Sequence, residues 1–238
     1  MRQPPIVGLV ALATALLVNL PFGTPLLPAA GSEPGFAAEQ PPLPPPAVRQ
    51  QHPFFATFSI CAIDPEAGQS GVAVTTRVPF VGRAVPWARA GVGAVATQSW
   101  TVVEYGREGL DLMEQGLPPA EALERLLAED AGRELRQLGL IDMQGRTVAH
   151  TGAENGDWAG SRQGENYTVQ ANIMVGPEVV AAVADSFEAT AGRGMPLAER
   201  LILALEAGQA EGGDKRWGRL QSAALRGADP SQPGRGGD

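Results

Sequence analysis

Cysteine, histidine and lysine are scarce in this chain of 238 residues. The single cysteine, Cys61, excludes an intramolecular disulfide. With only His52 and His150 beside it, a structural zinc site lacks ligands, and no EF-hand loop supplies oxygen ligands for Ca²⁺. The sequence therefore predicts no metal and no other cofactor, and leaves a carboxylate-bound Mg²⁺ or Ca²⁺ open as the alternative.

Positive charge is also in short supply. The chain has 18 Lys and Arg against 26 Asp and Glu, a formal net charge of -8 and a pI near 4.9. A surface that binds nucleic acid needs clustered Lys and Arg, so this balance argues against such a partner. The length suits one sizeable domain and is short for two.

Charge is absent from an apolar run, residues 6–20, that follows Arg2. A basic start and a short apolar core are typical of a secretory signal, whereas a membrane span needs about 20 apolar residues. We therefore expect residues 1–38 to be a signal peptide of an exported protein, with a membrane anchor through residues 6–20 as the alternative. Prolines crowd residues 39–53, which are expected to form an extended linker.

Hydrophobic periodicity and turn signals predict a folded domain over residues 54–226 and a disordered tail over residues 227–238. Short turns between neighbouring strands imply antiparallel pairing. The order fits two sheets face to face with helices outside, or a simpler α+β domain. The expected strands are 54–63, 70–76, 90–98, 135–141, 146–150, 167–175 and 221–225, and the expected helices are 104–115, 118–130, 176–190 and 196–210. A polar loop is expected over residues 151–166.

The first of these strands carries three potential nucleophiles at a spacing of two, Thr57, Ser59 and Cys61. Side chains alternate between faces along a strand, so these three share one face, and Phe58 and Ile60 point the other way. A hydroxyl at the start of such a strand is where an enzyme with an N-terminal nucleophile keeps its reactive group. An ordinary β-branched strand is the other interpretation.

Several segments carry a resemblance to a known family, and they are, in order, TFSICAIDPEAGQSGVAV, VPWARAGVGAVATQ, HTG, DWAG, QANIMVGPEVV and LEAGQAEGGDKRWGRLQSAAL. They resemble the family called domain of unknown function 1028. That family is grouped with the N-terminal nucleophile (Ntn) hydrolases, so the resemblance implies a four-layer α/β/β/α sandwich of antiparallel sheets flanked by helix pairs. The chain departs from the family pattern by lacking a Cys after HTG, and by having Ser161 in place of a His and Ala171 in place of a Gly.

The resemblance also implies a chemistry. In an Ntn hydrolase the chain is cut before its nucleophile, and the freed α-amine, whose pKa is about 7.7–8.0, becomes the base. Here the bond is Ala56–Thr57, with Thr57 as nucleophile. Asn172 is expected to donate to an oxyanion and Asp214 to hold the α-ammonium. Polar strand ends and loops supply the expected substrate-binding residues, Arg77, Thr97, Gln98, Arg216, Gln221 and Ser222.

The sequence thus favours an exported amidohydrolase that cleaves a small amide or peptide bond, with cell-wall peptides as one candidate substrate. Ser59 and Cys61 are then packing residues. The alternative is a catalytically inactive protein of the same fold that binds a small acidic ligand. A homo-oligomer is left open, and so is a product whose final strand, ending at Leu225, is too short for a stable sheet edge.

Overall fold

Two antiparallel sheets and four α-helices make up the part of the chain that the structure, a computed structural model, describes: residues 56–156, 158–213 and 222–231. These residues lie within the unit Pro42–Asp238. The expected α+β class with antiparallel pairing is confirmed. The expected signal peptide and linker, residues 1–53, lie outside the described residues.

The first sheet has the strand order β7-β8-β1-β2-β9 and the second has the order β3-β4-β5-β6. Neighbouring strands pair antiparallel throughout both sheets. The strands of the first sheet are β1 (Thr57–Asp64), β2 (Gln69–Thr76), β7 (Ala159–Gly164), β8 (Tyr167–Asn172) and β9 (Ser222–Ala228). Those of the second are β3 (Pro86–Arg89), β4 (Gly93–Ser99), β5 (Arg136–Asp142) and β6 (Thr147–Thr151).

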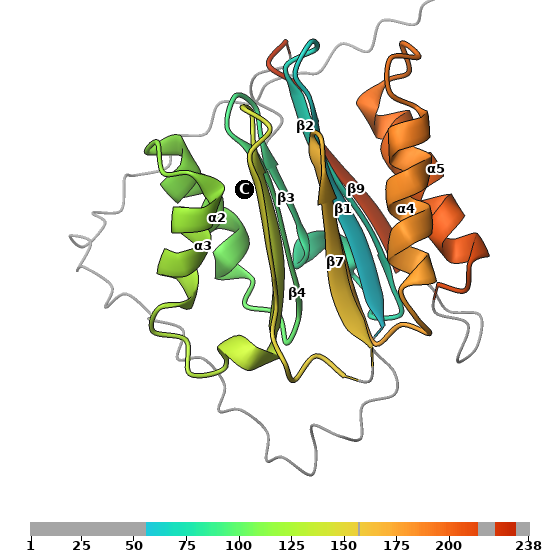
Figure 1. The fold of residues 1–238 in the computed structure, drawn as a ribbon. Helices are drawn as coiled ribbons and strands as arrows, with labels where there is room; N and C mark the ends of the chain where they lie inside the picture. Colours follow the sequence, from blue (N-terminus) through green and yellow to red (C-terminus); the bar gives the residue numbers. More distant parts are fainter. Residues whose placement is uncertain (1–55, 157, 214–221, 232–238) are drawn as a thin grey trace, which may run out of the picture. The chain divides into compact units, whose positions relative to one another are not determined.

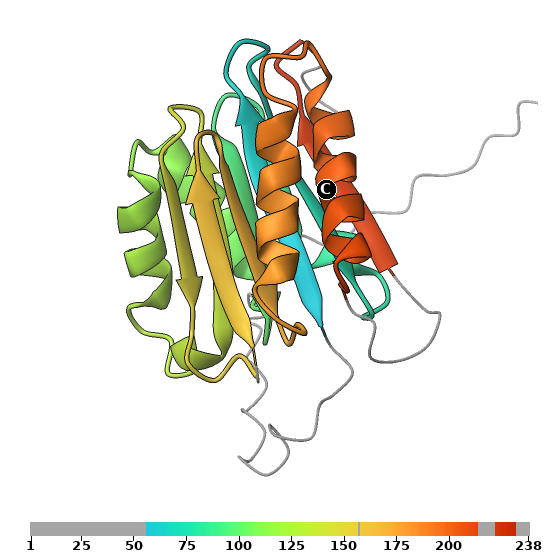
Figure 2. The same cartoon turned by 45° about the vertical axis from the view of Figure 1, so that its right-hand side comes forward.

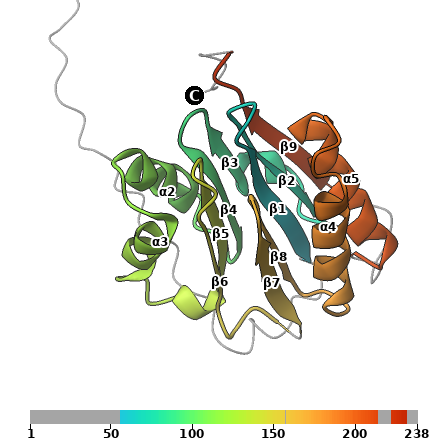
Figure 3. The ribbon, with the colours of Figure 1, turned by 45° about the horizontal axis from the view of Figure 1, so that its top comes forward.

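A helix pair packs on the outer face of each sheet (Figures 1 and 2). The helices α4 (Glu178–Ala189) and α5 (Leu197–Ala210) cover the first sheet, and α2 (Glu104–Glu114) and α3 (Pro119–Leu127) cover the second. The inner faces of the two sheets meet each other (Figure 3). Single turns of 3₁₀-helix, η1 (Val81–Arg83) and η2 (Arg133–Leu135), join elements. None of the helices in the described ranges is long and apolar enough to cross a membrane.

Strand β1 follows the predicted alternation. Phe58, Ile60 and Ala62 belong to the apolar cluster under α4 and α5. Cys61 and Ile63 belong to the cluster between the sheets. The predicted division of the two faces is therefore confirmed, and the three potential nucleophiles point toward the second sheet.

The sequence missed two edge strands and ended a third too early. β7 lies where a polar loop was expected, because an edge strand paired on one side only needs no apolar pattern. β3 begins at Pro86, which is tolerated at the start of an edge strand. β9 continues past Leu225 to Ala228, which pairs with Ser70, so the expected tail begins within a strand.

Candidate active site

Four hydroxyl and amide side chains form a row across one end of the first sheet. The strand register places Thr57 opposite Thr76 on β2 and opposite Asn172 on β8, and Thr76 lies opposite Ser222 on β9. Directly opposed residues of an antiparallel pair point to the same face. The row therefore faces the second sheet, and it brings together three predicted site residues: Thr57, Asn172 and Ser222.

The hydroxyls of Thr57 and Thr76 contact each other, with 2.9 Å between the two Oγ1 atoms. The ladder explains this approach. The Ile63 N–H donates to the Asn166 carbonyl, so by alternation Thr57 and Asn172 form a pair of the hydrogen-bonded kind. Thr57 and Thr76 then form the other kind of pair, in which side chains come closer. Thr57 is 6% exposed, so it lies just below the surface.

Ser59 and Cys61 lie deeper on the same face, and neither is placed to react with a substrate. Both are fully buried. The Ser59 hydroxyl donates to Gln98 Oε1 at 2.7 Å. Burial raises the pKa of the Cys61 thiol, and a weak hydrogen bond from the Gln170 amide does not offset this effect. Cys61 is therefore a neutral thiol in a core position.

A network of buried amides joins the two sheets behind Thr57. Gln98 and Gln137 come from the second sheet, and Gln170 and Asn172 come from the first. Gln137 Oε1 accepts from Gln98 Nε2 at 2.8 Å and from Asn172 Nδ2 at 3.0 Å. Gln170 Nε2 donates to the Ser59 hydroxyl at 2.7 Å. These groups are 0–1% exposed, so their mutual hydrogen bonds replace water.

Two of the strands that supply this network end in strained backbone. Ile173 follows Asn172 with φ 55°, and Ser99 follows Gln98 with φ 72°. The left-handed region is rarely adopted by residues other than Gly, and least of all by a β-branched residue such as Ile. Strain of this kind costs about 1–3 kcal/mol and gathers at functional sites.

The remaining predicted site residues fall into three groups. Gln98 lies in the amide network, and Arg77 directly follows Thr76, so it lies at the same end of the sheet. Thr97 points away from this site, because its neighbours Ala94 and Ala96 alternate to the face between the sheets, and its hydroxyl donates to the Val102 carbonyl. Asp214, Arg216 and Gln221 lie outside the described residues.

Sequence reasoning missed Thr76, Gln137 and Gln170. A signal for the two glutamines was present, since each alternates with apolar residues in a buried strand. Thr76 follows from the hairpin, because pairing Asp64 with Gln69 sets Thr57 opposite Thr76.

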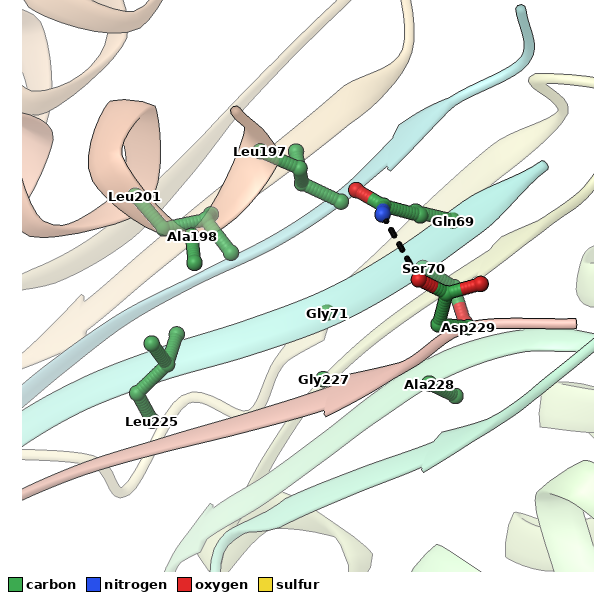
Figure 4. A pocket seen from close by; sticks show the side chains of 10 residues that line it. All are labelled: Gln69, Ser70, Gly71, Leu197, Ala198, Leu201, Leu225, Gly227, Ala228 and Asp229. Carbon is green, nitrogen blue, oxygen red and sulfur yellow. Dashed lines mark hydrogen bonds between the residues drawn. The ribbon is translucent and has the colours of Figure 1, made fainter. Parts of the chain in front are cut away.

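A pocket in the described part of the chain lies elsewhere, between α5 and the edge strand β9 (Figure 4). It has a cavity volume of about 130 Å³, and Gln69 closes one end by donating to Asp229 at 3.0 Å. Gln69 pairs with Asp64, at the far end of β1 from Thr57. Its apolar wall includes Leu197 and Leu201 of the helix-covered face, so the pocket shares neither face nor end with the Thr57 row. Among the described residues, no group of His, Cys, Asp and Glu side chains is arranged to hold a metal ion.

Comparisons with known proteins agree on one family. The sequence model of the family described as "Family of unknown function (DUF1028)" matches residues 57–233. The chain is also similar to the crystal structure of protein SPO2555 from Silicibacter pomeroyi, which carries the same family label. The identity is 32%, the TM-score is 0.68, and the match covers 75% of this chain and 75% of that chain. No curated protein matches the chain.

Proposed function

Since the chain belongs to the DUF1028 family, a member of which has a solved structure with a similar fold, we propose that it is an amidohydrolase of the N-terminal nucleophile type that cleaves a small amide or peptide bond. Thr57 is the proposed nucleophile, and its α-amine, freed by cleavage of the Ala56–Thr57 bond, is the proposed base. The two sheets with their outer helix pairs correspond, in this proposal, to the four layers of the Ntn hydrolase fold.

The position of Thr57 carries the proposal. It is the first residue of β1 and the first residue of the family match, and its hydroxyl reaches the end of the sheet among Thr76 and Asn172. Ser59 and Cys61, the competing nucleophiles on this strand, are fully buried and hydrogen-bonded. The strained backbone at Ile173, at the end of the neighbouring strand β8, also supports the proposal, because such strain gathers at functional sites.

The proposed reaction uses the two groups of one residue. Thr57 Oγ1 forms a bond to the carbonyl carbon of the substrate amide while its proton passes to the α-amine. The C–N bond then breaks, and the α-ammonium returns a proton to the leaving amine. Water hydrolyses the resulting ester, which releases the acid and restores the Thr57 hydroxyl.

Maturation is the first test. We propose that residues 1–38 direct export and that a second cut exposes Thr57. Intact mass and N-terminal sequencing of the mature protein should then give a chain that starts at Thr57. A mature chain that starts before Ala56 and is never cut further leaves Thr57 without a free amine, and this outcome sinks the proposal. The Thr57→Ala variant identifies what makes the cut. It stays uncut if Thr57 cleaves its own chain, and it is still cut if a separate protease cleaves the chain.

Acylation is the second test. The mature protein is treated with 4-nitrophenyl acetate, quenched in acid, and mapped by peptide mass. We expect one acetyl ester on the Thr57 hydroxyl, retained in Thr57→Ser as an ester on serine. Thr168→Val is a matched control, because Thr168 lies on the same inner face but is fully buried. We expect Thr168→Val to be acetylated on Thr57 like the wild type. If both proteins are acetylated only at the α-amine, or at scattered sites, the result would contradict a nucleophilic Thr57.

A protein that binds a small acidic ligand remains the second candidate. Arg77 favours it, because this half-buried cationic side chain lies at the same sheet end as Thr57. Arginine holds carboxylates through paired N–H donors. This function needs no cut before Thr57, so an uncut, folded mature chain would support it over catalysis.

A further inference from the structure

From the direction of the hydrogen bonds in the amide network, we propose that the Asn172 side-chain oxygen is the acceptor that holds the α-ammonium of Thr57, and that Gln137 is the positioning residue that aims it. The inference rests on the proposed function, since only a chain cut before Thr57 has that α-ammonium. It replaces both earlier expectations for this site, in which Asn172 donated to an oxyanion and Asp214 held the amine.

The orientation of Gln137 is fixed by backbone acceptors. Its Nε2 donates to the Ala171 carbonyl at 2.9 Å and to the Gly160 carbonyl at 3.3 Å. Carbonyl oxygens only accept, so the NH₂ end of the Gln137 amide must face β7 and β8. Its Oε1 is then an acceptor in the middle of the network, and this assignment does not depend on how the neighbouring amides are oriented.

Gln137 in turn fixes Asn172. An acceptor at Gln137 Oε1 requires a donor from Asn172, and the Asn172 Nδ2 lies 3.0 Å away. The Asn172 Oδ1 must therefore point to the other side. This oxygen is fully buried, and no hydrogen-bond donor reaches it from the rest of the structure that is described here. Burying an acceptor without a donor costs about 1–3 kcal/mol of stability, so a hydrogen-bond donor that reaches the Asn172 Oδ1 would be stabilising.

The strand ladder places the nitrogen of Thr57 next to Asn172, the residue that carries this oxygen. Thr57 and Asn172 form a pair of the hydrogen-bonded kind, so the Thr57 N–H points toward β8. Their Cα atoms are then about 5.5 Å apart, with both side chains on the inner face. In the uncut chain, this nitrogen is an amide with one proton. Cleavage gives it two more protons and a positive charge, which supplies the donor that Asn172 lacks.

The consequence for catalysis is a controlled amine pKa. An acceptor that binds the ammonium form raises the pKa of the amine, and burial lowers it. Asn172 thus keeps the amine able to take up the proton of the Thr57 hydroxyl near neutral pH. A neutral amide suits this role, because a carboxylate in the same place would hold the proton too firmly for it to return to the leaving group.

The test measures that pKa without using catalysis. Mature protein that starts at Thr57 is trace-labelled with acetic anhydride over a range of pH, and labelling of the α-amine is read by peptide mass mapping. Lys215, the only lysine, is the internal reference in each sample. We expect Asn172→Asp to raise the pKa of the α-amine by about 1–2 units and Asn172→Leu to lower it by about 1 unit. Gln137→Met, which frees the Asn172 amide, should also lower it.

Asn155→Asp is the matched control. Asn155 is another buried asparagine whose Oδ1 has no donor, but its Nδ2 donates to the carbonyls of Gly152 and Arg136 and not to Gln137. It should leave the α-amine pKa unchanged.

The outcomes separate the two proposals. An uncut wild-type chain overturns the proposed function and this inference together. A cut wild-type chain whose α-amine pKa is unmoved in the Asn172 variants overturns the inference alone. Folded Asn172 variants that stay uncut also overturn it, because Asn172 would then serve the cleavage step. If one Asn172 variant fails to fold, the other and Gln137→Met decide.

Discussion

The ion pair between Asp130 and Arg136 gives the sharpest stability prediction. Their side chains are 4% and 7% exposed, and the guanidinium binds both carboxylate oxygens, at 2.7 and 3.1 Å. The Tyr105 hydroxyl and the Gly132 N–H donate to the same carboxylate. Arg136 immediately precedes Gln137, so this pair anchors the start of the strand that organises the amide network.

Asp130→Ala leaves a buried guanidinium without its counterion, which costs about 3–5 kcal/mol. With a urea dependence of about 2 kcal/mol/M, the unfolding midpoint should fall by roughly 2 M. The matched control is Asp185→Ala, which removes a 2.6 Å contact to Arg162 between side chains 37% and 66% exposed. An exposed pair is worth less than about 1 kcal/mol, so that midpoint should fall by less than about 0.5 M.

Urea unfolding followed by circular dichroism at pH 7 measures both variants. The double variant Asp130→Ala with Arg136→Met should regain part of the loss, because it leaves no unpaired buried charge. Equal midpoints for Asp130→Ala and Asp185→Ala would refute the reasoning, since burial would then make no difference to the pair.

Three further predictions concern single groups. Both tyrosines, Tyr105 and Tyr167, have pKa values raised above 10 by burial and by the carboxylates of Asp130 and Glu188, so their absorbance at 295 nm should titrate above pH 10 when folded and near pH 10 in urea. Because folding favours the neutral tyrosines, these groups stabilise the folded state fully below pH 10, and this contribution is lost as pH rises through the folded pKa. Titration of both tyrosines near pH 10 in the folded protein would contradict the prediction. Cys61 should resist iodoacetamide until the chain unfolds, and rapid labelling of folded protein would show that it is accessible. Gly139→Ala should cost about 1–3 kcal/mol in thermal unfolding, because its Cβ would lie 2.0 Å from Gln170 Oε1; an unchanged melting temperature would mean that the Gln170 side chain can move aside.

Local patterns in the sequence predicted most elements and the two faces of β1. Alternation in Phe58 and Ile60, and stripes such as Leu123 and Leu126, depend only on neighbours in the chain. The edge strand β7 has alternating intermediate and exposed side chains and no apolar pattern, so nothing local separated it from a loop.

The candidate site was predicted only in part, because it depends on pairings between distant segments. Thr57, Asn172 and Ser222 were predicted as polar strand residues, and the register shows that they share a row. The contact between Gln137 and Asn172 joins strands of different sheets. No periodicity within one segment encodes how two sheets lie against each other, so the direction of the amide network became available only from the structure.

The buried amide network also has a consequence for the order of events in the life of the chain. Its members come from residues 59 to 172, so they meet only after both sheets have formed and docked. Contacts so far apart in sequence form late and together. A nascent or unfolded chain thus carries Thr57 as an ordinary threonine next to an ordinary peptide bond. In the proposed function, completed folding is therefore a condition for activity in addition to the cut before Thr57, and the hydroxyl becomes reactive only when its own domain surrounds it.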